Sequence, residues 1–286
     1  MKQNSTREQM PLGPQNIAAM NFHYVRYSLE RFLADACESG VSRIELWGAA
    51  PHFFTEDRTL AEARELGRRI RGMGMELIAF TPEQCQYPIN ISSTDSRMRN
   101  RSIQYFMNCM EFAVELNAPA LLVTAGGGDR DEPAELAMAR CTDAMGLLCD
   151  RAGTLGVDLW MEVLPPAWSN IICNAQQMGA FFDQIASPSL HGVYDVAGAV
   201  MTGETAQDYF HHLRDRLAHI HMTDSDAQGS HMAWGEGIVD LNTLVSFLRI
   251  QNYQGSMSIE LTNWVYNLSP APPLRKCVAA LQQALA

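Results

Sequence analysis

Four short hydrophobic segments in the second half of the chain each end in a side chain that can bind a metal ion. These side chains are Glu162, Asp195, His221 and Glu260. They lie 33, 26 and 39 residues apart in the sequence, and each interval can hold one strand, one helix and two loops of a βα barrel. Because the carboxyl ends of parallel barrel strands meet at one face, we predict that the four side chains converge there.

Three carboxylates and one imidazole make a site that is rich in oxygen ligands. Such a site suits Mn²⁺, Co²⁺ or Mg²⁺ better than structural Zn²⁺, which prefers Cys and His, although Zn²⁺ stays a further candidate. A single acid at the end of a strand is as often a helix cap or half of an ion pair. Four candidates in successive βα units favour one bound divalent ion.

A divalent ion next to two carboxylates favours proton transfer at carbon. The ion polarises neighbouring carbonyl and hydroxyl oxygens of a sugar, which makes the proton on the adjoining carbon more acidic. One of Glu162 and Glu260 can remove this proton, and the other can return it to the opposite face of the enediolate. The carbon is then inverted. We therefore predict that these two residues are catalytic as well as metal ligands.

The elements that must position these residues alternate between strand-like and helix-like patterns along the chain. The chain has 286 residues, of which 47% are apolar and 19% charged, which allows one large core. We predict a polar N-terminal tail at residues 1–14 and a single domain at residues 15–286. This α/β domain is expected to be a single (β/α)8 TIM barrel of eight parallel strands. The strands are expected at residues 16–21, 43–47, 76–80, 120–124, 157–162, 190–195, 217–221 and 256–260.

Composition also excludes several classes of protein. The net charge of −11 argues against a general nucleic-acid surface, which is usually basic. Seven cysteines without a CxxC motif are typical of reduced thiols rather than of a disulfide framework. No apolar run reaches membrane-spanning length, and the N-terminus lacks the apolar core of a signal peptide. We therefore predict a cytoplasmic protein that binds neither nucleic acid nor a membrane.

Several motifs resemble those of the sugar isomerase/epimerase barrels of the xylose isomerase-like superfamily, and most closely its fructoselysine-type 3-epimerases. They are Ile44-Glu45-Leu46-Trp47-Gly48, Thr81-Pro82-Glu83, Val193-Tyr194-Asp195, His219-Ile220-His221 and Glu260-Leu261. The resemblance implies the same four metal ligands and the same catalytic pair of glutamates. It also implies inversion at carbon 3 of a ketose or ketosamine, a small sugar or sugar-amine substrate, and a homo-oligomer.

The chain departs from the ketose 3-epimerases at three positions that contact substrate in that branch. Trp168, Gly198 and Ala227 stand where those enzymes have Glu, His and Arg. Relatives of the fructoselysine type also lack the last two features, which favours a ketosamine substrate. Trp168 is expected to form an apolar or stacking wall for a substituent on the sugar.

Other residues at the ends of strands or in the following loops are candidates for substrate binding. His23 and His231 could donate hydrogen bonds to sugar hydroxyls, with a surface-loop histidine as the alternative. Glu83 could accept from a hydroxyl or an ammonium group, whereas Trp47 could bind substrate or only pack the rim.

Four other functions compete with a 3-epimerase. A sugar isomerase, or a dehydratase of a polyol or keto acid, would start from the same proton removal. An abasic-site endonuclease shares this barrel type but needs further metal ligands and a basic face. A non-catalytic sugar-binding barrel would not need two glutamates.

Overall fold

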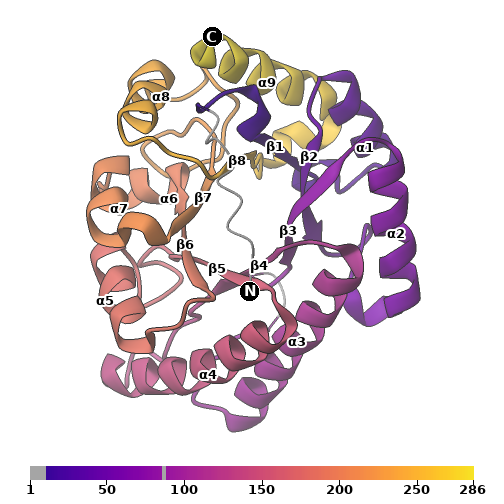
Figure 1. Cartoon of the computed structure of the whole chain (residues 1–286). Coiled ribbons are helices and arrows are strands. Elements are labelled where there is room, and N and C mark those ends of the chain that lie inside the picture. The colour runs from indigo at the N-terminus through magenta and orange to yellow at the C-terminus, as the bar shows by residue number, and fades with distance from the viewer. Residues whose placement is uncertain (1–10, 86–87) are drawn as a thin grey trace, which may run out of the picture.

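Eight parallel strands close into one barrel in the computed structural model, which describes residues 11–85 and 88–286 (Figure 1). Each strand pairs with the next along the chain, and β1 also pairs with β8, which closes the ring. The predicted (β/α)8 barrel is therefore confirmed. The strands are β1 (Ile17–Met20), β2 (Arg43–Gly48), β3 (Glu76–Pro82), β4 (Ala120–Thr124), β5 (Asp158–Glu162), β6 (Leu190–Asp195), β7 (Leu217–His221) and β8 (Ser256–Ile259).

Helices surround the strands on the outside of the barrel (Figure 1). Local sequence signals define their ends: the Thr59 hydroxyl accepts from the backbone N–H of Glu62 and caps α2, and Gly156 adopts a left-handed φ of 70° after α4. The α-helices are α1 (Leu29–Glu38), α2 (Leu60–Gly72), α3 (Ser96–Leu116), α4 (Ala134–Leu155), α5 (Ala175–Ile185), α6 (Val196–Thr202), α7 (Ala206–Leu213), α8 (Leu241–Ile250) and α9 (Ala271–Leu285). Short 3₁₀ turns occupy η1 (Pro14–Asn16), η2 (Phe22–Tyr24), η3 (Thr55–Asp57), η4 (Arg214–Arg216) and η5 (Trp264–Leu268).

Helix α6 is an element that the sequence pattern did not predict. It begins directly after β6, where only a loop was expected. The Asp195 carboxylate caps it by accepting from the backbone N–H groups of Ala197 and Gly198, at 3.0 and 2.8 Å. This cap fixes the direction in which a candidate metal ligand points.

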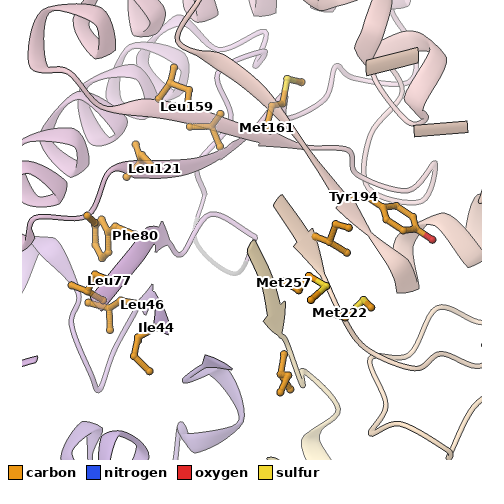
Figure 2. Packing of buried hydrophobic residues seen from close by; sticks show 14 of the residues in the cluster. Ile44, Leu46, Leu77, Phe80, Leu121, Leu159, Met161, Tyr194, Met222 and Met257 are labelled. Atoms are coloured by element: carbon orange, nitrogen blue, oxygen red, sulfur yellow. The ribbon is translucent and has the colours of Figure 1, made fainter. Parts of the chain in front are cut away.

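Alternate residues of each strand face opposite sides of the barrel wall. Leu159 and Met161 pack into the large core between strands and helices (Figure 2), whereas Trp160 between them belongs to a smaller cluster with Ile78 and Leu122. The same alternation places Ile44 and Leu46 in the large core. It therefore directs the polar side chains of Glu45 on β2 and His219 on β7 into the barrel.

The N-terminal boundary differs slightly from the expected one. Residues 1–10 of the predicted tail lie outside the described residues. Leu12, which belongs to the remainder of that tail, is buried in the core, so packing begins before residue 15. Within the described part of the chain, no helix combines the length and the apolar character that crossing a membrane requires.

Candidate metal centre

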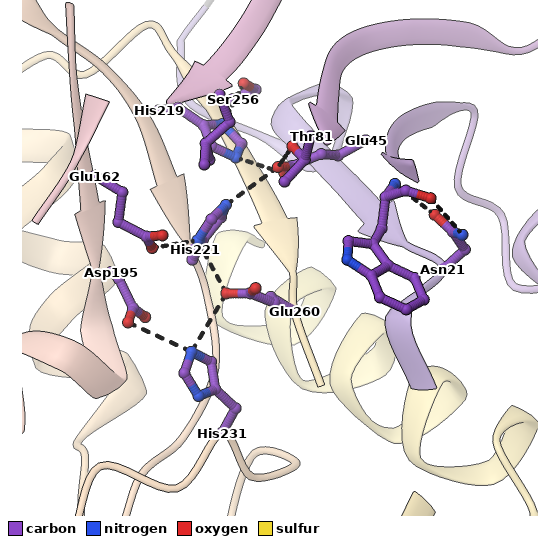
Figure 3. A network of polar contacts seen from close by, with 12 residues as sticks. Asn21, Glu45, Thr81, Glu162, Asp195, His219, His221, His231, Ser256 and Glu260 are labelled. Atoms are coloured by element: carbon purple, nitrogen blue, oxygen red, sulfur yellow. Dashed lines mark hydrogen bonds and ion pairs between the residues drawn. The ribbon is translucent and has the colours of Figure 1, made fainter. Parts of the chain in front are cut away.

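The four predicted metal ligands converge at the carboxyl ends of neighbouring strands (Figure 3). Glu162, Asp195 and His221 are the last residues of β5, β6 and β7, and Glu260 follows β8 directly. One ligand atom from each of the four lies within 4.8 Å of the others. The His221 Nδ1 atom lies 2.9 Å from Glu162 Oε1 and 2.9 Å from Glu260 Oε2. The structure thus brings together the set that the spacing predicts.

Burial of three carboxylates around one imidazole creates a strong need for positive charge. Burial raises the pKa of Glu162 to about 7. Burial would also raise the pKa of Glu260, but the nearby imidazoles of His221 and His231 hold it below its usual value. Burial alone would lower the pKa of His221, yet the surrounding carboxylates, Glu260 foremost, raise it well above its usual value. Three oxygen donors and one nitrogen donor in this charge balance fit a divalent cation.

His231 joins this centre from the loop between β7 and α8. Its Nε2 atom lies 3.3 Å from Asp195 Oδ2 and 3.3 Å from Glu260 Oε2. The loop is held in place by the buried carboxylate of Asp224. That carboxylate accepts hydrogen bonds of 2.8 to 3.0 Å from the backbone N–H groups of Ser225, Gly235, Gly237 and Val239. The Asp224 side chain thus binds the backbone of the loop that carries His231.

A cavity of about 420 Å³ opens over the four ligands. Its lining includes His231 and three further residues predicted to bind substrate, which are Trp47, Glu83 and Trp168. Trp47 is buried, and its indole Nε1–H donates to Glu83 Oε2 at 2.9 Å. Trp168 is 64% exposed at the cavity wall. The structure therefore gathers four of the five predicted substrate-binding residues at one opening.

His23, the fifth of these residues, is fully buried and does not line the cavity. Its ring packs edge-on against Tyr24, with centroids 4.8 Å apart. Burial lowers the pKa of His23 to about 3, and the nearby backbone of Pro270 offsets only part of this effect, since neither ring nitrogen makes a well-formed hydrogen bond. Direct contact between His23 and a substrate stays a prediction from the sequence.

Two chemically important residues behind His221 were not singled out from the sequence. Glu45 on β2 and His219 on β7 are fully buried inside the barrel, and together with His221 they form a second group with metal-binding spacing. A lone acid between Ile44 and Leu46 was a usable signal, because strand alternation directs Glu45 away from the large core and into the barrel.

Comparisons with known proteins agree with this architecture. Residues 33–282 match the family described as xylose isomerase-like TIM barrel. A fructoselysine 3-epimerase of Escherichia coli O157:H7 is 31% identical over 243 residues, which cover 85% of this chain and 88% of that protein.

Two solved structures share the fold at low sequence identity. An L-ribulose 3-epimerase superposes with a TM-score of 0.79 at 18% identity and covers 94% of each chain. The IOLI protein with a binding zinc atom superposes with a TM-score of 0.78 at 16% identity, covering 95% of this chain and 99% of that one.

Proposed function

This chain belongs to the xylose isomerase-like TIM barrel family, and we propose that it is a divalent-metal-dependent epimerase that inverts carbon 3 of a ketose or ketosamine. Family membership, which the sequence motifs predicted, is confirmed, and it makes the protein an enzyme of the sugar isomerase/epimerase superfamily. The observation that carries the finer proposal is the pair of Glu162 and Glu260. Their carboxylates come from β5 and from the end of β8 and meet at the same nitrogen of His221.

Glu162, Asp195, His221 and Glu260 would hold one divalent ion. We propose Mn²⁺, Co²⁺ or Mg²⁺, with Zn²⁺ as a further candidate, because three of the four donors are oxygens. When bound, the ion would polarise the carbonyl and hydroxyl oxygens beside the reacting carbon.

The two glutamates would divide the proton transfer between them. Their strands, β5 and β8, are separated in the ring by β6 and β7, and we propose that their carboxylates would face a bound sugar from different sides. One takes the proton from carbon 3, and the electron pair of the broken C–H bond enters the enediolate of the substrate. The other glutamate gives a proton to the opposite face. No oxidant or reductant is consumed. After each turnover the two glutamates exchange protons with water, which restores their starting protonation.

The charge of the cavity supports a neutral or cationic substrate. Glu83 adds a fourth carboxylate to the three of the metal centre, and among the described residues that line the cavity there is no Lys or Arg. A phosphate or carboxylate group held next to these four carboxylates would therefore lack a cationic side chain to pair with. A ketosamine nitrogen, by contrast, would be favoured by the Glu83 carboxylate that Trp47 holds in place. This disfavours a keto acid as substrate.

The apolar part of the wall supports a substituted sugar. Trp168, Met201 and Leu164 line the cavity beside the polar centre. Trp168 and Met201 are exposed, and they would be covered by an aliphatic chain attached to the sugar.

The test is proton NMR in D₂O with the metal-loaded enzyme, plain ketoses and fructoselysine. Deuterium at carbon 3 together with a new epimer is the expected result. Deuterium at another carbon would show an isomerase or a dehydratase instead. The absence of exchange in every substrate, with metal bound, would refute the proposal.

Matched variants assign the chemistry to the two carboxylates. Glu162→Gln and Glu260→Gln are each expected to lower the exchange rate at least ~100-fold. Glu135→Gln, on the exposed face of α4, serves as the control for a charge change remote from the cavity. Substantial turnover in either active-site variant, with metal content equal to wild type, would remove that glutamate from the mechanism.

A further inference from the structure

A buried polar network lies behind the metal centre, inside the barrel (Figure 3). Glu45 is its hub, and the side chain is 0% exposed. Its carboxylate accepts from Thr81 Oγ1 at 2.6 Å and faces the Nε2 atoms of His219 at 2.9 Å and His221 at 3.2 Å. An ionised group at this depth is stable only if donors surround it. Thr81, His219 and His221 can each donate a hydrogen bond to the Glu45 carboxylate.

The two ring nitrogens of His221 face different partners. Nδ1 points to the candidate metal ligands Glu162 and Glu260, whereas Nε2 points to Glu45. A neutral imidazole has one N–H group and one nitrogen lone pair. If the proton is on Nε2, where the carboxylate of Glu45 accepts it, the lone pair is on Nδ1 and is directed at the metal centre.

We propose that Glu45 is a positioning residue, which holds the proton of His221 on Nε2 and so commits Nδ1 to the metal ion. This inference rests on the four-ligand metal site of the proposed function. It adds a residue from β2, on the other side of the barrel, to the residues that determine metal affinity. Glu45 acts through His221 and does not touch the ion.

Glu45 is itself held in one orientation by the rest of the network. The Nδ1 atom of His219 lies 2.6 Å from Ser256 Oγ, and the Trp160 ring stacks on the His219 ring with centroids 4.7 Å apart. Ser256 can donate to His219 Nδ1, and His219 then carries its proton on Nε2 and donates it to Glu45. Since His219 and Glu45 are both 0% exposed, water does not compete for these bonds.

A different placement of the protons on His219 and His221 would give a different metal site. Glu45, His219 and His221 have spacing that could hold a metal ion of their own. In that case both Nε2 atoms would be metal ligands, and the proton of His221 would sit on Nδ1, toward Glu162. The two arrangements differ in the tautomer of His221 and in the number of ions bound per chain.

The tautomer can be observed directly in the wild-type protein. We would load protein labelled with ¹⁵N-histidine with Zn²⁺ and record long-range ¹H–¹⁵N correlation spectra, assigning His221 by the signals lost in His221→Gln. The expected spectrum shows a protonated Nε2 and a metal-bound Nδ1, with one Zn²⁺ per chain. A metal-bound Nε2, or two ions per chain, would overturn the inference.

Metal affinity of matched variants tests the same point independently of catalysis. Glu45→Gln keeps the size of the side chain but replaces one acceptor oxygen by a donor. It is expected to raise the Kd for Mn²⁺ by about 10- to 100-fold, the range found for partners of metal-bound histidines. Ser256→Ala removes an outer bond of the same buried network and leaves Glu45 next to His221. It is expected to change the Kd less than about threefold.

These outcomes separate the inference from the proposed function. If wild-type protein binds no divalent ion, both fail. If wild type binds one ion and Glu45→Gln binds it with an unchanged Kd, only the role of Glu45 fails. Equal weakening in Glu45→Gln and Ser256→Ala would show a general effect of disturbing the buried network and would also refute a specific role for Glu45. Circular dichroism of the metal-free variants verifies that each one is folded.

Discussion

Protonation of His23 should destabilise the fold as the pH falls. The imidazole is fully buried, and burial lowers its pKa from an ordinary value of 6.5 to about 3. In the unfolded chain the same imidazole titrates near its ordinary value. Between these two pKa values the unfolded state therefore binds more protons than the folded state. Stability is unaffected by His23 above pH 6.5 and is lost progressively as the pH falls from 6.5 toward 3.

The size of this effect follows from the difference between the two pKa values. Each unit is equivalent to about 1.4 kcal/mol. At pH 4.5 the pH lies about two units below the pKa of His23 in the unfolded state. The contribution of His23 should therefore make the free energy of unfolding roughly 3 kcal/mol lower than at pH 7.5. Carboxylates also titrate in this range, so the effect must be measured as a difference between wild type and a variant in which residue 23 cannot be protonated.

Urea unfolding of metal-free wild type and His23→Leu at pH 7.5 and pH 4.5 would isolate the contribution. Wild type should lose about 3 kcal/mol more than the variant between the two pH values. His211→Gln, which changes an exposed histidine on α7, should behave like wild type. Equal losses in wild type and His23→Leu would show that His23 is not buried as a neutral imidazole. A raised KM for His23→Leu would instead support the substrate contact predicted from the sequence.

Three further predictions concern the metal site, the substrate wall and the packing of the helices. Gly198→Ala should weaken metal binding at least ~10-fold in calorimetric titration, because its Cβ would lie 2.8 Å from Asp195 Oδ2; an unchanged Kd would show that Asp195 can move without loss. Trp168→Ala should weaken binding of a ketosamine with a long aliphatic chain by about 1–2 kcal/mol while leaving the Kd of the plain ketose nearly unchanged. Equal effects on both ligands would contradict an apolar wall for the substituent. Gly67→Ala should destabilise the fold by about 1–3 kcal/mol in urea unfolding, because its Cβ would lie 2.5 Å from the Leu116 carbonyl oxygen on α3. Its control, Gly146→Ala in open space on α4, should stabilise the fold by up to about 1 kcal/mol, and the reverse order would refute the packing argument.

Local sequence signals were sufficient for most of the fold. The bounds of β4 (Ala120–Thr124), β6 (Leu190–Asp195) and β7 (Leu217–His221) agree with the predicted ranges, and the other predicted strands agree within two residues at each end. A buried parallel strand is a continuous hydrophobic run, so its position depends on adjacent residues alone. The positions of the four predicted metal ligands follow from the same local pattern, because each lies at the end of its own strand.

Helix α6 shows where local signals were overlooked. The segment after Asp195 is short and apolar, and it was predicted as a loop between β6 and α7. Asp195 was interpreted as a metal ligand, but in the structure it also caps this helix through the N–H groups of Ala197 and Gly198. An aspartate directly before a small apolar segment is a helix-start signal, so helix α6 could be predicted from the sequence.

The environment behind the ligands was decided only by tertiary structure. Glu45 and His219 are 174 residues apart in the sequence, yet their side chains lie 2.9 Å apart across the barrel. Their meeting depends on closure of the ring and on the register of β2 and β7, and neither of these is encoded in nearby residues. His23 is a similar case. It lies just after β1, as several cavity-lining residues lie at the ends of their strands, yet its side chain is buried and does not line the cavity. The sequence by itself determined which residues end the strands, because strand pattern is local; the structure decided which of them face one another, because contacts across the barrel depend on the whole closed sheet.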